Sequence, residues 1–482
     1  MRPTFFVLIL AAACGGRDNS TPDASTHHDS SVTIDAPADA SLDSPPHPDA
    51  PPGPASRVWV VGDFATNGTQ QAGWFTDGDT LPVTPALVPA SPAVLAVNVP
   101  ANSGTGTPAR PWTNFVFDAN ATATAYVADV TTAGTFDLYA AGADGTTPAL
   151  LVPGGATTEI ASIALSPDGT KVAYTMDSAT TDNAYDVWVV NTTGTPVPLL
   201  VSPARNVMAP DLTKLSAFTG SLKWSADSKW IGFSGDFTTD GHSQVYVVDT
   251  TAATPAPVEL VADADITGTG IGIRGDVLFD ANDNAYFRAA LTDNATFVFY
   301  KWDGAQRTTL TLPARGDSTT SIVGSFAISP DGATIVFAAD APLASAYDLY
   351  ATPLAAWNPT KITNATLAST NPPFGIAPAF SPDGTQVAFV ADYVTDGVTE
   401  PFVAPIDGSG MHRLTNVTVT NADAEQVSWT VDGTGVYVQG DLETNNESTL
   451  FRLDASMTDG TATKAMAVVT SGDVVNSLIR TK

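Results

Sequence analysis

The sequence has a single cysteine, Cys14, so no disulfide can form within the chain. Basic residues are also scarce, because 20 Lys and Arg stand against 50 Asp and Glu and give a formal net charge of −30. Such a surface repels phosphate groups, so we expect no nucleic-acid partner. Charged residues make up only 15% of the chain, whereas 43% are hydrophobic, which is enough for a large core.

Long apolar runs are absent apart from one near the start, FFVLILAAA after Arg2. This run is too short to span a bilayer, and its positive start and small final residues are typical of a secretory signal. Cys14 follows directly, and AAAC at 11–14 resembles the bacterial lipobox, with Ala11 where Leu is usual. The resemblance implies a signal peptide over 1–13 and acyl chains on Cys14 that anchor the protein. Plain secretion is the alternative.

Residues 14–56 have the composition of a flexible tether. Asp, Ala, Ser and Pro recur, no Phe, Tyr or Trp occurs, and the large aliphatic residues are few, Val32, Ile34 and Leu42. Such a segment cannot bury enough apolar surface to fold, so the sequence predicts a disordered linker between anchor and folded domain.

The phrase SPDG occurs three times, at Ser166, Ser329 and Ser381, and each copy runs into alternating apolar residues. Pro presets φ at the first central position of a β-turn and Gly tolerates positive φ, so each copy predicts strand, turn, strand. Aligned on this turn, the chain shows seven equivalents. They centre on the apolar residue before the turn: Phe117, Leu165, Trp224, Phe279, Ile328, Phe380 and Trp429.

Two further apolar stretches follow each pair, so that four strands recur in roughly 50 residues, as in the blades of a β-propeller. The segment from Val58 supplies only strands two to four of a blade, and residues 473–479 supply the missing first strand. The sequence therefore predicts an all-β fold over 57–482: one propeller of eight four-stranded blades, closed by both ends of the domain. Seven blades with an irregular N-terminal extension is the alternative.

SPDG, the alternation after it and third strands such as DLY and DVW resemble the TolB-type propeller repeat. Related repeats occur in propellers of dipeptidyl peptidases, tricorn proteases and oligogalacturonate lyases. The resemblance covers roughly 57–482 and implies a fold more than a function, since scaffolds and enzymes share it. The peptidases carry an added hydrolase domain, but no G-x-S-x-G and no βαβ pattern occurs here.

The folded part offers little catalytic chemistry. His242 and His412 are its only histidines, too few for the histidine cluster that the resembling lyases use to hold a metal. The acidic DANDN at 280–284 falls in the turn slot, so we interpret it as a turn, not as half of a calcium loop. We expect no catalytic residue and no cofactor, with a structural Ca²⁺ left open. A backbone-bonding role is assigned to the turn carboxylates Asp168, Asp331, Asp383 and Asp432.

Most second strands end in an acidic residue, and the longer, irregular loops follow there, which is where functional loops usually lie. Hairpin carboxylates around a channel mouth would focus negative potential. The candidate binding face comprises Asp63, Asp129, Asp177, Asp236, Asp240, Asp340, Asp392, Asp396 and Asp441.

Two functions remain open. The first is a lipid-anchored, monomeric, non-enzymatic binding scaffold of the bacterial cell envelope. Its partner would be an envelope protein or a cell-wall component, met through the acidic loop face, and it would touch the membrane only through its anchor. The alternative is a secreted hydrolase or lyase that acts on polysaccharide or peptide with carboxylates at the channel mouth.

Overall fold

The computed structural model describes residues 57–480 with internal gaps, and the predicted signal and tether at 1–56 lie outside the described residues. The gaps are 67–68, 78, 84–85, 88–114, 120–121, 129–136, 143–147, 156–159, 179–180, 205–221, 240, 274, 315–322, 342–346, 364–377, 395–396, 420–421, 446 and 466–476.

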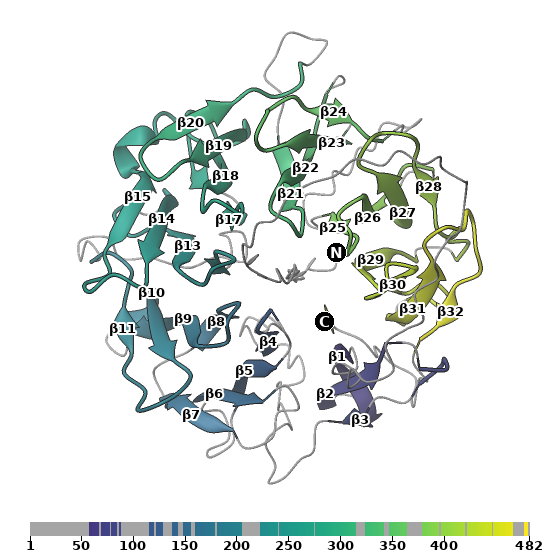
Figure 1. Cartoon of the computed structure of the whole chain (residues 1–482), viewed down its shortest axis with the longest axis horizontal. Helices are drawn as coiled ribbons and strands as arrows, with labels where there is room; N and C mark the ends of the chain where they lie inside the picture. The colour runs from purple at the N-terminus through teal and green to yellow at the C-terminus, as the bar shows by residue number, and fades with distance from the viewer. Residues whose placement is uncertain are drawn as a thin grey trace, which may run out of the picture.

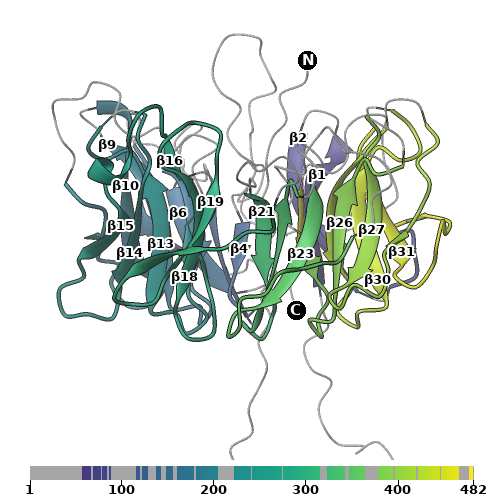
Figure 2. The ribbon, with the colours of Figure 1, turned by 90° about the horizontal axis from the view of Figure 1, so that it is seen from above.

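The fold is an all-β propeller. In the described part of the chain, the strands form eight antiparallel sheets, which lie side by side around a ring (Figure 1). Each sheet runs from an innermost strand near the axis to an outermost strand at the rim, and the strands cross the thickness of the ring (Figure 2). Among the described residues, the one helical segment is a short 3-10 helix, η1 (Asp263–Asp265). No helix there has the length and apolarity needed to cross a membrane.

One sheet, here called the closing sheet, contains strands from both ends of the described chain. Its strands are β1 (Arg57–Thr66), β2 (Thr69–Thr76), β3 (Ala86–Leu87) and β33 (Ser477–Arg480), in the order β3-β2-β1-β33. The next three sheets comprise β4 (Phe115–Phe117), β5 (Ala123–Ala128), β6 (Asp137–Gly142) and β7 (Ala149–Val152); β8 (Ile160–Leu165), β9 (Lys171–Ser178), β10 (Thr181–Asn191) and β11 (Leu199–Leu200); and β12 (Lys223–Trp224), β13 (Trp230–Gly235), β14 (Gln244–Asp249) and β15 (Pro257–Val261).

The other four sheets continue in chain order. They comprise β16 (Gly272–Ile273), β17 (Leu278–Phe279), β18 (Ala285–Ala290), β19 (Val298–Trp302) and β20 (Arg307–Leu310); β21 (Val323–Ile328), β22 (Thr334–Ala339), β23 (Asp348–Pro353) and β24 (Thr360–Lys361); β25 (Ala379–Phe380), β26 (Gln386–Ala391), β27 (Glu400–Pro405) and β28 (His412–Arg413); and β29 (Ala424–Trp429), β30 (Gly435–Gly440), β31 (Thr449–Asp454) and β32 (Thr463–Lys464).

The repeat alignment is confirmed at the level of single residues. All seven alignment residues are the last residue of an innermost strand, at the ends of β4, β8, β12, β17, β21, β25 and β29. The sequence pattern therefore marked where each sheet turns from its first to its second strand.

The predicted ring closure is also present. β33 pairs antiparallel with β1, with Val58 opposite Arg480 and Val60 opposite Leu478. Val58 and Val60 are fully buried against Tyr437 and Leu450 of the sheet β29–β32. The closing sheet thus joins its neighbour through an apolar contact, as the other sheets do.

Stacked aromatic pairs recur between the second and third strands. Their ring centroids lie 5.6 to 5.9 Å apart, and cross-strand pairs of this kind stabilise a sheet. The pairs are Tyr126–Tyr139, Phe233–Tyr246, Phe287–Tyr300, Phe337–Tyr350 and Phe389–Phe402. The DLY phrases of the repeat supply Tyr139 and Tyr350, the third-strand rings of two of these pairs.

Candidate functional site

One face of the ring, here called the turn face, carries the turns between first and second strands. In the first SPDG copy the Ser166 hydroxyl donates to Asp168 Oδ1 over 2.6 Å, and the Thr170 amide donates to the same oxygen over 3.0 Å. The Lys171 amide donates back to Ser166 Oγ over 2.9 Å. The same bonds recur at Asp331, Asp383 and Asp432, so the backbone-bonding role predicted for these carboxylates is confirmed.

Neighbouring turns are bonded to one another. The Ala119 amide donates to the Pro167 carbonyl over 2.9 Å, and the Asp168 amide donates to Ser228 Oγ over 3.0 Å. Gly332 has a φ of +67°, and a Cβ there would lie 2.5 Å from the Ala281 amide nitrogen, so only glycine fits. Turns of neighbouring sheets are therefore in direct contact on the turn face.

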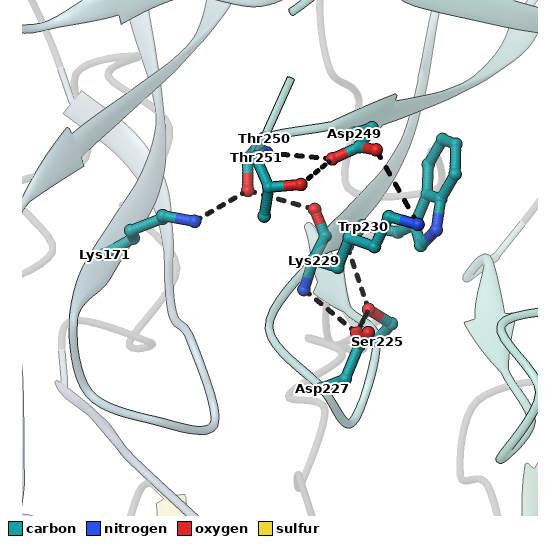
Figure 3. A network of polar contacts seen from close by, with 8 residues as sticks. All are labelled: Lys171, Ser225, Asp227, Lys229, Trp230, Asp249, Thr250 and Thr251. Carbon is teal, nitrogen blue, oxygen red and sulfur yellow. Dashed lines mark hydrogen bonds and ion pairs between the residues drawn. The ribbon is translucent and has the colours of Figure 1, made fainter. Parts of the chain in front are cut away.

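A polar network ties two sheets together near this face (Figure 3). Lys171 Nζ donates to Thr250 Oγ1 over 3.0 Å, and that hydroxyl donates to the Lys229 carbonyl over 3.0 Å. Lys229 Nζ in turn lies 3.7 Å from Asp249 Oδ2. The network joins β9 to the end of β14, so the neighbouring sheets cannot slide past one another here.

The turn face displays exposed carboxylates at equivalent positions. Hydroxyl groups of Ser329 and Ser381 hold the pKa values of Asp331 and Asp383 below the usual range, which keeps both ionised. Fixed negative charges of this kind attract cationic groups. The exposed members are Asp168, Asp227, Asp331, Asp383 and Asp432.

The candidate binding face lies at the opposite end of the strands, here called the hairpin face. Asp129, Asp240 and Asp396 are outside the described residues, and Asp63 is described only as a backbone position in β1. The other five have exposed fractions of 1 to 8%, so they are buried: Asp177, Asp236, Asp340, Asp392 and Asp441.

Two of the buried hairpin carboxylates accept backbone amides of loops at the hairpin face. Asp441 Oδ1 accepts the Asp423 amide over 2.5 Å, and Asp423 Oδ1 accepts the Thr399 amide over 2.8 Å. In another sheet, Asp236 Oδ2 accepts the Gly241 amide over 3.4 Å. A partner on this face would meet the loops that these carboxylates position. Binding by the nine aspartates stays a prediction.

Both histidines of the folded part take part in local contacts. His242 lies in the hairpin between β13 and β14, with Nδ1 2.6 Å from Asp263 Oδ1. His412 opens β28, and its Nε2 lies 2.8 Å from the Ala455 carbonyl oxygen. Over the described residues, no three His, Cys, Asp or Glu side chains group to hold a metal ion.

The DANDN segment is a turn, as interpreted from the sequence. Asp280 Oδ1 accepts the amides of Asn282 and Asn284 over 2.8 and 3.0 Å. Asp280 Oδ2 accepts Asn284 Nδ2 over 2.8 Å. The carboxylate is thereby bonded within its own turn.

Sequence reasoning missed a buried charged group beside the inner strands. Lys223 is 5% exposed on β12, and its Nζ lies 3.6 Å from Asp276 Oδ2. Burial lowers the pKa of Lys223, and the nearby Asp276 carboxylate opposes that shift. Arg288 is also buried and donates to the Val323 carbonyl over 2.9 Å. The signal in the sequence was Lys223 itself, a lysine within a predicted inner strand.

These features define a class of protein, an all-β propeller with hydrogen-bonded turns on one face and irregular loops on the opposite face. No family model and no curated protein matches the sequence.

Among solved structures, a prolyl endopeptidase aligns with a TM-score of 0.49 and 12% identity, over 73% of this chain and 49% of that one. This chain thus spans about half the length of that protein. The β-propeller domain of the Trilobed protease from Pyrococcus furiosus aligns with a TM-score of 0.40 and 12% identity, over 74% of this chain and 95% of that one. TolB from Acinetobacter baumannii aligns with a TM-score of 0.34 and 18% identity, over 73% of this chain and 78% of that one.

Proposed function

We propose that the chain is a lipid-anchored, non-enzymatic binding scaffold of the bacterial cell envelope. The observation that carries the proposal is the set of exposed carboxylates on the turn face, one at each of five equivalent turns. Their hydrogen bonds fix both position and charge, so a cationic partner would find preordered contacts and lose little entropy on binding. A basic segment of an envelope protein, or a cationic group of a cell-wall component, has the matching chemistry.

The anchor half of the proposal rests on Cys14. Acyl chains on that residue would hold the propeller at a membrane through the 14–56 tether, while the net charge of −30 keeps the domain off anionic headgroups. Fractionation of cells that express the Cys14→Ser variant tests this. We expect the wild type in the membrane fraction and the variant in the soluble fraction. An unchanged distribution would refute lipidation.

The binding half is tested with a defined cationic probe, an oligolysine peptide, by titration calorimetry on the full mature chain. The triple change of Asp331, Asp383 and Asp432 to Asn should weaken binding at least tenfold. A matched triple at exposed third-to-fourth strand turns removes equal charge, with Asp303, Asp407 and Asp454 changed to Asn. Both triples lie at the same end of the strands and long-range charge treats them alike, so equal losses would show that the first-to-second strand turns are not the site.

The proposed absence of catalytic activity is tested on a panel of glycans and peptides. Turnover of any member by the purified chain, abolished by one carboxylate substitution, would replace the scaffold with the hydrolase or lyase alternative.

A further inference from the structure

A group of side-chain oxygens gathers at the hairpin end of the sheet β29–β32. Gln426 on β29 lies directly opposite Gln439 on β30, so both side chains are on one face of the sheet. Glu425 occupies the register shift between Ala424 and Gln426, where β29 has an extra residue. Such a bulge re-aims side chains, and here it brings Glu425 beside the two glutamines.

Two hydrogen bonds show that the side chains of Glu425, Gln439 and Ser448 converge, and the strand register places Gln426 beside them. Gln439 Nε2 donates to Glu425 Oε2 over 3.2 Å, and Ser448 Oγ donates to the same oxygen over 3.2 Å. The first bond orients the Gln439 amide, because its nitrogen must face the carboxylate. The Ser448 oxygen keeps lone pairs for a further contact.

Gln426 supplies the observation that points to a ligand. The side chain is 8% exposed, and its Oε1 is buried with no hydrogen-bond partner. A buried carbonyl oxygen without a donor costs free energy, and native structures rarely leave one. A species that accepts lone pairs would remove this cost.

The group faces the joint that closes the ring. Tyr437 precedes Gln439 by two positions on β30, so the two side chains share a face of the strand. Tyr437 packs against Val58 and Val60 of the closing sheet. A ligand held by this group would therefore sit between the last sheet and the closing sheet.

We propose that Glu425, Gln426, Gln439 and Ser448 bind a hard cation, Ca²⁺ or Na⁺. The donors are one carboxylate, two amide groups and one hydroxyl, and oxygen donors of this kind suit hard cations and not thiolate- or imidazole-seeking metals. Mg²⁺ fits less well, because it demands octahedral geometry and keeps its waters. Because the donors meet only when the sheet β29–β32 has formed, the ion would stabilise the folded state by mass action.

The test is unfolding of the full mature chain after treatment with a chelator in sodium-free buffer. Ca²⁺, Na⁺ and Mg²⁺ are titrated separately, with choline chloride holding ionic strength constant. We expect the midpoint of unfolding to rise to a plateau with increasing Ca²⁺ or Na⁺. The cation whose titration gives this rise is the ion that the site binds. Midpoints that respond to all salts alike would overturn the proposal.

Three variants make the test specific. Glu425→Gln should weaken the cation response at least tenfold, whereas Glu443→Gln, the same change at an exposed residue of the same hairpin, should leave it intact. Gln426→Leu should abolish the response and raise the midpoint in cation-free buffer, because it removes the unbonded oxygen. Equal losses for both glutamates would indicate general counter-ion screening. A wild type without any cation response would show that the oxygens hold only water.

Discussion

The hydroxyl of Tyr437 donates to Asp77 Oδ1 over 2.9 Å, although the two residues are 360 positions apart in sequence. Asp77 Oδ2 accepts the Val431 amide over 2.7 Å. One carboxylate beyond β2 therefore holds both a strand and a turn of the sheet β29–β32. The bond to the Val431 amide extends the ring of bonded turns across the closing joint.

Substitution of Asp77 should weaken this joint. Asp77→Ala removes the acceptor of two donors that pack in the interface, so the free energy of unfolding should fall by about 1–3 kcal/mol. Chemical denaturation of the full chain measures the change. Asp79→Ala is the control, because Asp79 accepts only the exposed Thr76 amide. Equal effects of the two substitutions would show that the cross-joint bonds contribute nothing specific.

The turn carboxylates predict a pH dependence. The Ser381 hydroxyl bonds to Asp383 and lowers the pKa of Asp383 in the folded chain, so the unfolded chain binds more protons there. The stabilisation is therefore complete above the unfolded pKa and is lost as pH falls through the folded pKa. Asp383→Asn should lower the free energy of unfolding by about 1 kcal/mol at pH 7 and by less near pH 3. Unfolding curves at both values check it, and a pH-independent deficit would contradict it.

Such turns show what could be predicted from the sequence. SPDG combines a φ preset by Pro, an Asp that bonds the backbone and a Gly that accepts positive φ, so its conformation is encoded within four residues. The alternating apolar residues around each turn predict the strands, and the recurrence of four strands in roughly 50 residues predicts the propeller. The pairing of β1 with a C-terminal strand followed because an incomplete first repeat required a partner, although β33 (Ser477–Arg480) extends one residue past the predicted 473–479.

The candidate site was harder to predict, because burial depends on packing between segments distant in the sequence. The position of Asp392 at a strand end is readable from the sequence, but its exposed fraction of 2% depends on the tertiary packing around it. The convergence of Glu425, Gln426 and Gln439 depends on a register shift that no local pattern signals. Sequence gives the place of a side chain along a strand, while its neighbours come from the assembled ring.

A buried ion pair predicts the opposite pH dependence. Glu400 is 1% exposed, and its Oε1 lies 2.7 Å from Arg413 Nη1. Burial raises the pKa of Glu400, although Arg413 opposes the shift. Arg413→Met removes that opposition and leaves the carboxylate uncompensated, which should cost about 3–5 kcal/mol at neutral pH.

The sign of the dependence follows from proton binding. In Arg413→Met the folded chain holds the Glu400 proton more tightly than the unfolded chain, so stability falls as pH rises through the folded pKa. The deficit should therefore be larger at pH 7 than at pH 4, and a second change, Glu400→Gln, should recover part of it. Denaturation of the single and double variants measures both effects. A double variant no more stable than the single one would show that the charge is not the cause.

Removal of β33 should destabilise the whole ring. Deletion from residue 477 onward takes away the ladder partner of β1 and uncovers one side of the closing sheet. We expect a markedly lower melting temperature and faster proteolysis, whereas deletion of residues 481–482 alone should change neither. If the longer deletion melts like the intact chain, the β1–β33 ladder does not hold the ring together.

The position of β33 also sets an order of events during synthesis. Because residues 477–480 follow every other described strand, translation must deliver nearly the entire domain before β1 acquires its partner. Until then β1 lacks its ladder partner, and Val58 and Val60 cannot pack against Tyr437 and Leu450 before those residues have been synthesised. Chain connectivity therefore prevents the β1–β33 ladder from forming before synthesis of the domain is nearly complete.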